Sequence, residues 1–348
     1  MEATYFLGAC TGKGFLSYYD DLLGQADTVR IIKGGSGCGK STFMRAIAAA
    51  ARERGLEVTS ILCSSDPDSL DGVYLPRLKL AFADGTAPHV LEPGLCGGSR
   101  NYLNFGEFYD RVGMEKNEAE ILRIQEENRA QYPTVTCCLA ASDRLTEIFR
   151  RQTALNCYEE ELEAIAECLC LSTLKAVGDR GQLQKRFLHA LTPKGLYFCR
   201  KTPAAVCRKI YVLKDNYFQA PKVLGHISRR AKELGHRCIL CYSPLLPEEA
   251  PVHLLLPDAG VAFLSENREL SYSEPCFCRI DLDASLPPVL RRELDVYGSL
   301  QTTLCTRAVS HLREAKRLHD RMEQLCKPFV DFSAITALTQ KTIREIFG

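Results

Sequence analysis

The chain has 348 residues, of which 46% are hydrophobic and 25% charged, the composition of a folded globular protein rather than a disordered one. Its 44 Lys and Arg residues are balanced by 43 Asp and Glu, so no global charge attracts it to nucleic acid or to an anionic membrane. No apolar run approaches the length of a membrane span, and no basic stretch followed by a long apolar one opens the chain. We therefore expect a cytoplasmic protein without nucleic-acid or membrane partners, and the length predicts two domains. The composition identifies no protein partner.

Residues 28–33, with the sequence TVRIIK, are β-branched and apolar, which predicts a short buried strand. The strand runs directly into a segment that matches the pattern G-x-x-x-x-G-K-[ST] at every fixed position. An alanine-rich helix is predicted over residues 43–54, with Gly55 as its C-terminal stop. This strand and helix are the context that the pattern requires, so a phosphate loop is favoured over a chance glycine-rich turn. The candidate nucleotide-binding residues are Gly34, Gly35, Ser36, Gly37, Cys38, Gly39, Lys40, Ser41 and Thr42.

The residue types in this segment suit a nucleoside triphosphate. Glycines let successive backbone N–H groups approach phosphate oxygens, and the helix that follows adds the positive end of its dipole. We expect Lys40 to reach the β- and γ-phosphates, Ser41 to bind Mg²⁺ through its hydroxyl, and Thr42 to contact the α-phosphate. The predicted cofactors are ATP and Mg²⁺. ATP is favoured over GTP because no N-K-x-D-like base-recognition motif follows.

Two acidic positions follow predicted strands downstream of the loop. The apolar segment 78–83 ends in Asp84, which we predict to be a Mg²⁺ ligand and a catalytic residue, although Asp-Gly is also a common turn dipeptide. Asp66 follows the predicted strand 58–63, at the strand end where an α/β sheet binds its ligands. Asp66 is a catalytic candidate that could position water or a second substrate, and a solvated turn is the equal alternative.

The second half of the chain repeats the first with a different loop. Residues 6–15 resemble residues 187–196, and the predicted strand ending at Lys33 aligns with one ending at Lys214. The lysine, the hydroxyl and the acid are lost in the second copy: Lys40 aligns with Ala220, Ser41 with Pro221 and Asp84 with Ser265. We therefore predict that the second copy binds no magnesium nucleotide.

Both copies keep T-x-K-G, at residues 11–14 and 192–195. Because the second copy keeps this motif without a phosphate loop, we expect a structural or inter-domain role. A phosphate contact by Lys13 is the less favoured alternative.

Helical sequence follows each copy. Apolar residues recur near helical spacing from residue 115, with a break expected at Pro133, and a long amphipathic pattern starts at Pro287. We expect these segments to serve inter-domain packing, with a lid or a partner site as the alternatives. The predicted fold is α/β, a P-loop NTPase three-layer sheet duplicated in tandem. We place the active domain at residues 1–114 and a helical appendage at 115–180. The degenerate domain follows at 181–286 and a helical tail at 287–348.

We interpret the 17 cysteines as free thiols that pack as small hydrophobic residues. Cys238 and Cys241 have the spacing of a metal-ligand pair, but they lie in a predicted strand, where core packing is favoured over zinc.

The segments KGGSGCGKST, CSSDPDSLDGV and ADGTAPHV, together with the T-x-K-G motifs, resemble an uncharacterised family of bacterial duplicated P-loop ATPases over essentially the full length. Both halves often carry a P-loop in that family, and this chain departs from it in the second half. The resemblance implies ATP binding and hydrolysis but no particular substrate. We expect a Mg²⁺-dependent ATPase with one nucleotide site. The alternatives are a small-molecule kinase, with Asp66 or Asp68 as the base, and a nucleotide-gated binding protein with little turnover.

Overall fold

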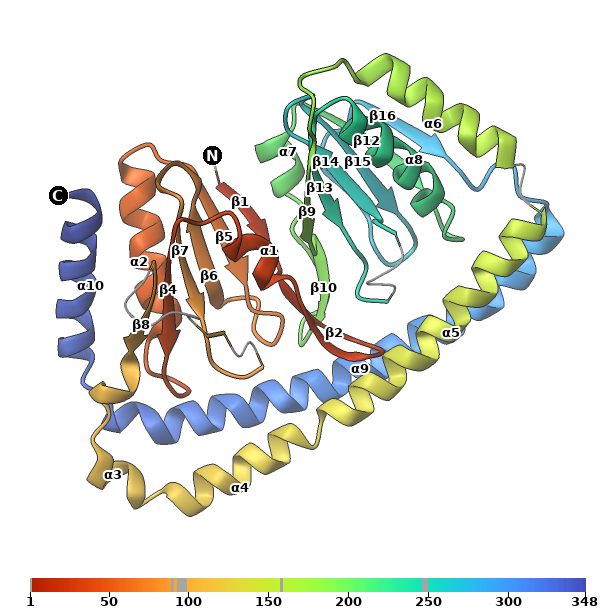
Figure 1. Ribbon diagram of the computed structural model, residues 1–348. Helices are drawn as coiled ribbons and strands as arrows, with labels where there is room; N and C mark the ends of the chain where they lie inside the picture. The colour runs from red at the N-terminus through yellow and green to blue at the C-terminus, as the bar shows by residue number, and fades with distance from the viewer. Residues whose placement is uncertain (1, 89–90, 93–98, 157–158, 246–249) are drawn as a thin grey trace.

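The computed structural model describes residues 2–88, 91–92, 99–156, 159–245 and 250–348, and it contains two α/β units joined by long helices (Figure 1). Each unit has a six-stranded sheet with both parallel and antiparallel neighbours. Strand order along the first sheet is β1-β5-β6-β7-β4-β8, and the matching order along the second is β9-β13-β14-β15-β12-β16. The α/β character and the two similar halves expected from the sequence are therefore confirmed.

The first sheet places the predicted strand 28–33 beside the strand that ends in Asp84. These are β4 (Thr28–Lys33) and β7 (Leu80–Asp84), which are parallel, with Ile32 opposite Asp84. An antiparallel strand that the sequence did not indicate, β6 (Leu70–Leu75), lies on the other side of β7. The remaining strands are β1 (Glu2–Tyr5), β5 (Val58–Leu62) and β8 (Arg100–Asn104).

The second sheet repeats this arrangement around the parallel pair β12 (Lys209–Lys214) and β15 (Val261–Glu266). The strand that corresponds to β6 is β14 (His253–Leu256), which is again antiparallel to both neighbours. The remaining strands are β9 (Gln182–Arg186), β13 (Arg237–Cys241) and β16 (Cys278–Asp281). Each unit has one helix directly after its central strand and loop, α2 (Lys40–Glu53) in the first and α8 (Ala220–Glu233) in the second.

Each T-x-K-G motif forms the turn of a β-hairpin. The hairpins are β2 (Gly8–Thr11) with β3 (Gly14–Ser17), and β10 (His189–Thr192) with β11 (Gly195–Phe198). In the first, the Thr11 hydroxyl donates to the Gly14 carbonyl at 2.8 Å and accepts from the Lys13 backbone N–H at 3.1 Å, and the second hairpin repeats both bonds. The structural role expected for this motif is confirmed, because threonine and glycine together close the turn.

Long helices connect the two units. The helix α9 (Pro288–Cys326) runs antiparallel to α4 (Glu118–Arg129) and α5 (Tyr132–Asn156), below both sheets in Figure 1. The break expected near Pro133 is confirmed, since α4 ends at Arg129 and α5 begins at Tyr132. The other helical segments are α1 (Tyr19–Leu23), η1 (Pro76–Leu78), η2 (Phe105–Phe108), α3 (Arg111–Glu115), α6 (Glu159–Thr173), α7 (Thr202–Val206), η3 (Lys327–Phe329) and α10 (Phe332–Phe347).

The helical segments are exchanged between the units. The helix α6, which follows the first unit in sequence, packs on α8 of the second, and α10, which follows the second unit, packs on α2 of the first. The units also share one hydrophobic core, and Phe6 pairs with Phe187 across their boundary through two backbone hydrogen bonds of 2.9 Å. The appendages thus provide packing between the units. None of the helices in the described residues combines the length and apolar character that crossing a bilayer requires.

Candidate functional site

The glycine-rich loop, residues 34–42, joins the end of β4 to the first turn of α2. Gly37 and Gly39 have φ values of 75° and 84°, in the left-handed region that glycine enters without steric cost. The loop curls around the Lys40 side chain, whose Nζ donates to the carbonyl oxygens of Gly34 at 2.7 Å and Gly35 at 2.9 Å. The strand, loop and helix expected from the sequence are therefore present, and the loop carbonyls hold the lysine ammonium group.

Small residues are required where the loop meets its support. A Cβ at Gly34 would lie 2.7 Å from the Cys38 sulfur, and a Cβ at Gly35 would lie 2.9 Å from the Tyr109 hydroxyl oxygen. That hydroxyl donates to the Ser36 carbonyl oxygen at 2.9 Å. Tyr109 thus fixes the outer side of the loop from the segment between η2 and α3. Sequence reasoning gave Tyr109 no role, because no local pattern connects it to a loop far away in the chain.

Asp84 lies next to Lys40 at the end of β7. Its Oδ2 is 3.6 Å from Lys40 Nζ, and its Oδ1 accepts from the Thr86 backbone N–H at 2.8 Å and from the Thr86 hydroxyl at 2.5 Å. Burial raises the pKa of the Asp84 carboxyl group above its ordinary value, while Lys40 and Thr86 lower it and Asp71 raises it further. The structure therefore brings together the lysine and the acid that were predicted separately.

Asp71 adds a second buried carboxyl group that sequence reasoning did not single out. It precedes Gly72, which pairs with Ala83, the residue before Asp84, so Asp71 and Asp84 lie at the same end of neighbouring strands. Only 7% of Asp71 and 9% of Asp84 is exposed. The two carboxyl groups are close enough to interact, because Asp71 raises the pKa of Asp84. Asp71 was missed because the sequence did not indicate the antiparallel strand β6, which positions it.

Ser41, Thr42 and Asp66, which were also predicted as site residues, do not contact the Lys40–Asp84 pair through any hydrogen bond or ion pair found among the described residues. The Ser41 hydroxyl oxygen, in the first turn of α2, accepts from the Leu70 backbone N–H at 2.9 Å, and Thr42 is exposed one residue later. Asp66 does not join Lys40 and Asp84: among the described residues, its side chain accepts from Ser69 at 3.0 Å and pairs with Lys316 at 3.5 Å. It lies at the edge of the site, where α9 approaches.

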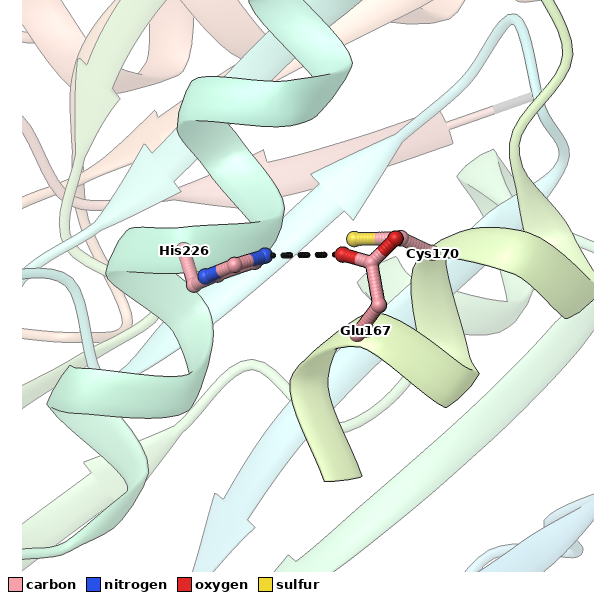
Figure 2. Close-up of side chains that lie close together, drawn as sticks. All are labelled: Glu167, Cys170 and His226. Atoms are coloured by element: carbon pink, nitrogen blue, oxygen red, sulfur yellow. Dashed lines mark hydrogen bonds and ion pairs between the residues drawn. The ribbon is translucent and has the colours of Figure 1, made fainter. Parts of the chain in front are cut away.

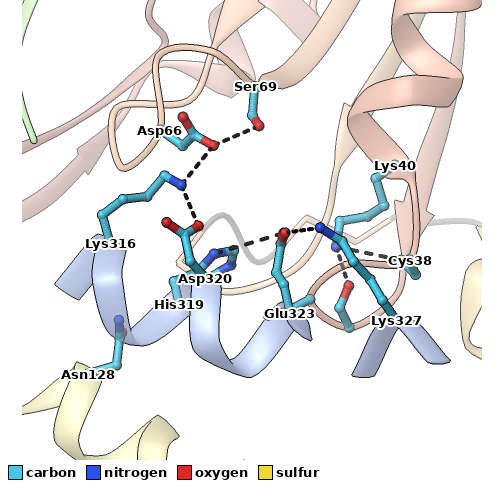
Figure 3. A network of polar contacts seen from close by, with 12 residues as sticks. Cys38, Lys40, Asp66, Ser69, Asn128, Lys316, His319, Asp320, Glu323 and Lys327 are labelled. Atoms are coloured by element: carbon cyan, nitrogen blue, oxygen red, sulfur yellow. Dashed lines mark hydrogen bonds and ion pairs between the residues drawn. The ribbon is translucent and has the colours of Figure 1, made fainter. Parts of the chain in front are cut away.

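Figure 3 shows that the C-terminal part of α9 covers the glycine-rich loop. A Cβ at Gly37 would lie 3.3 Å from the Glu323 carbonyl oxygen, and Glu323 pairs with Lys327 at 3.0 Å. His319, on the same face of α9, lies 3.9 Å from Glu323 and within the electrostatic influence of Lys40, and its burial lowers the pKa of the imidazole. These groups follow the second unit in sequence, so a local pattern could not assign them to this site.

The corresponding loop of the second unit contains its own carboxyl group. Asp215, which aligns with Gly34, accepts through its carboxylate from the backbone N–H groups of Gln219 at 2.6 Å and Ala220 at 3.0 Å. These are the amides at the N-terminus of α8, where a helix attracts an anion. Burial raises the pKa of the Asp215 carboxyl group to about 7. Phe218 keeps the left-handed backbone of Gly37, with φ 61°, so the path of the loop is similar although its chemistry differs.

A cluster of possible metal ligands lies elsewhere, between α6 and α8. Figure 2 shows Glu167 and Cys170 on α6 facing His226 on α8. One possible ligand atom from each of the three lies within 4.8 Å of the others. His226 Nε2 lies 3.1 Å from Glu167 Oε2. Burial and the Glu167 charge raise the pKa of the Cys170 thiol to about 11, so the sulfur keeps its proton at neutral pH. We interpret the cluster as a contact between the two helices. Cys238 and Cys241, considered above as a ligand pair, are buried in β13.

Comparison of the chain with protein-family models, with curated proteins and with solved structures gave no match.

Proposed function

We propose that the first unit is a P-loop NTPase domain and that the protein is a Mg²⁺-dependent ATPase with one nucleotide site, at the glycine-rich loop. The observation that carries this proposal is the position of Lys40 Nζ, 2.7 Å from the Gly34 carbonyl and 3.6 Å from the Asp84 carboxylate. A lysine held between loop carbonyls and a strand-end acid needs only a rotation of its side chain to meet the β- and γ-phosphates of ATP.

The residues present fit a magnesium ion. Asp84 and Asp71 supply carboxylate oxygens and Ser41 supplies a hydroxyl, the hard oxygen ligands that Mg²⁺ prefers. Bound Mg²⁺ would neutralise charge on the transferred phosphate. This chain's own residues would orient the nucleotide: the loop amides would cradle its phosphates, Lys40 would compensate their charge, and α9 would cover the loop. Asp66 remains a candidate for positioning the attacking water from the edge of the site.

The loop of the second unit differs in a way that favours a single nucleotide site, in the first unit. Its Asp215 carboxyl group already accepts from the amides at the helix N-terminus that would attract a phosphate, so a phosphate would have to displace it. The proposal therefore assigns nucleotide binding to the first unit and a supporting role to the loop of the second.

One observation also favours a nucleotide-gated switch with little turnover. The helix α9 contacts Gly37 at one end and the second unit at the other, so a nucleotide that moves the loop also displaces a helix shared by both units. A switch and an ATPase use the same site and differ in turnover.

The two functions are distinguished by measuring ATP binding and phosphate release on the full chain, with and without Mg²⁺. The test variants are Lys40→Ala and Asp84→Asn, and Lys222→Ala, in the first turn of α8, is the matched control. An ATPase releases phosphate without any acceptor, and it loses this activity in both test variants but not in the control. Tight binding without release supports the switch, and release that requires an added hydroxyl acceptor supports a kinase. Equal ATP binding by wild type and Lys40→Ala contradicts the proposal.

A further inference from the structure

A cavity of about 160 Å³ lies in the second unit, at the place that corresponds to the glycine-rich loop of the first. Its lining includes Asp215 and Ser265, which align with Gly34 and Asp84. The sheet registers extend this correspondence, because His253 pairs with Leu264 as Gly72 pairs with Ala83. Val252, which also lines the cavity, thus takes the place of Asp71. The cavity therefore replaces the acidic site of the first unit with a different chemistry.

The Asp215 side chain opposes a phosphate ligand in this cavity. The Asp215 carboxylate uses both oxygens to accept from the N-terminal amides of α8, and a phosphate could reach those amides only by displacing it. The ionised form of Asp215 would also repel a phosphate strongly, because the surrounding protein screens charge poorly. An uncharged ligand meets no such barrier.

A buried histidine pair supplies a hydrogen-bond donor to the cavity. The Ser265 backbone N–H donates to His253 Nδ1 at 3.1 Å, so in the neutral imidazole the proton of His253 is on Nε2. His253 Nε2 then donates to His189 Nδ1 at 3.1 Å, which places the proton of His189 on Nε2. Burial lowers the pKa of His189 to about 4, so both rings are neutral at pH 7.

The Nε2–H of His189 is an unused donor. His189 lines the cavity and is only 5% exposed, and among the described residues its Nε2 has no hydrogen-bond acceptor. An N–H group that faces a cavity can donate to an oxygen atom of a ligand or of a water molecule bound there. Its position in the wall of a cavity indicates where a ligand oxygen would bind.

The remaining walls set the size and character of the ligand. Apolar side chains from three parts of the chain line the cavity, among them Phe149 on α5, Leu191 on β10 and Leu294 on α9. An apolar cavity of similar volume in another protein accommodates benzene. Arg268 and Asp295, which also line the cavity, are more exposed and pair with each other at 2.5 Å.

We propose that this cavity binds a compact, uncharged molecule about the size of one six-membered ring, through apolar contacts and one oxygen that accepts from His189 Nε2–H. The same helix α9 lines the cavity and extends to the glycine-rich loop, so a bound molecule contacts an element shared with the first unit. Binding itself does not depend on the function proposed for the first unit.

Gly298 offers a direct way to fill the cavity. It lies inside α9 and lines the cavity, and a Cβ at this position would only approach Phe149 at 4.0 Å. In Gly298→Leu a side chain enters the cavity from a helix that favours leucine over glycine. Gly225→Leu is the matched control, because Gly225 lies inside α8 and a Cβ there meets nothing within 4 Å.

The test measures binding of two probes to the full chain, without nucleotide, by saturation-transfer NMR titration. Cyclohexanone has a ring and a carbonyl acceptor, and methylenecyclohexane has the same shape without an acceptor. We expect wild type and Gly225→Leu to bind cyclohexanone about fivefold more tightly than methylenecyclohexane, the effect of one net hydrogen bond. We expect Gly298→Leu to bind neither. Undiminished binding by Gly298→Leu, equal affinity of wild type for the two probes, or no binding of either probe would overturn the proposal. Omitting nucleotide keeps these outcomes separate from those of the ATPase test.

Discussion

The backbone of Gly37 lies directly against the backbone of Glu323, so that a Cβ on Gly37 would be 3.3 Å from the Glu323 carbonyl oxygen and 3.4 Å from its Cα. This contact joins the tip of the glycine-rich loop to α9, the helix that also lines the cavity of the second unit. A change in the loop must therefore be accommodated by α9.

Gly37→Ala should destabilise the protein more than Gly55→Ala. Both glycines have a left-handed backbone, with φ values of 75° and 71°, but a Cβ at Gly55 meets nothing within 4 Å. The control therefore measures the backbone strain alone, about 1 kcal/mol, and the contact with α9 should add at least another ~1 kcal/mol at Gly37. Urea unfolding of the two variants measures the difference. Equal unfolding free energies would show that α9 moves away from the loop at no cost.

The ion pair between Asp21 and Arg186 should contribute strongly to the contact between the units. Arg186 Nη1 lies 2.6 Å from Asp21 Oδ2, and the Arg186 side chain is only 4% exposed. Asp21→Ala removes the counter-ion of the buried Arg186 guanidinium group, which should cost about 3–5 kcal/mol of unfolding free energy. The exposed pair between Lys214 and Asp281 is the control, and Asp281→Ala should cost less than about 1 kcal/mol. Similar losses in the two variants, measured by urea unfolding, would contradict the prediction.

The raised pKa of Asp215 predicts a dependence of stability on pH. Its pKa of about 7 in the folded protein exceeds the ordinary value of 3.8, so between these values the folded state binds the extra proton and stability rises as the pH falls. From pH 7 to pH 5, the unfolding free energy of wild type should increase by about 2 kcal/mol relative to Asp215→Asn. The lowered pKa values of His189 and His253 make stability fall as the pH falls. Wild type and Asp215→Asn both contain these histidines, so the difference between the two proteins isolates the effect of Asp215. A constant difference in unfolding free energy between the two proteins from pH 7 to pH 5 would contradict the raised pKa of Asp215.

Asp84→Asn should remove the effect of Mg²⁺ on ATP affinity. In wild type we expect Mg²⁺ to raise the ATP affinity roughly tenfold. The substitution keeps the size of the side chain but removes the charge that would hold the ion, so Mg²⁺ should no longer improve ATP binding. ATP titrations in Mg²⁺ and in EDTA measure the effect. Asp27→Asn, an exposed acid of the same unit, should behave as wild type. If Mg²⁺ still improves binding to Asp84→Asn, the metal site lies elsewhere.

Local sequence patterns predicted the parts of the candidate site that are continuous in the chain. The β-branched segment before the loop, the glycines and the acid at the end of β7 each have a local signal, and the structure brings Lys40 and Asp84 together. The structure does not bring Asp66 to this pair, since a loop after a strand can turn toward several neighbours and Lys316 attracts this one.

The parts that sequence reasoning missed depend on contacts between distant segments. Asp71 joins the site because β6 inserts between β5 and β7, and His319 and Glu323 reach it along a helix that starts in the other unit. No periodicity within a segment reveals which unit a long amphipathic helix will cover. Asp215 is different: an acid shortly before a predicted helix is a recognised capping signal, and its alignment with Gly34 could have indicated an internal anion.

The most direct test of the central claim is calorimetric titration of the full chain with ATP in Mg²⁺, comparing wild type with Lys40→Ala and with the control Lys222→Ala. If the glycine-rich loop holds the phosphates, wild type and the control bind one ATP per chain, and Lys40→Ala binds at least about tenfold more weakly because the charge between loop and phosphate is gone. Equal affinity in all three proteins would place nucleotide binding outside the loop, and no binding by wild type would exclude it.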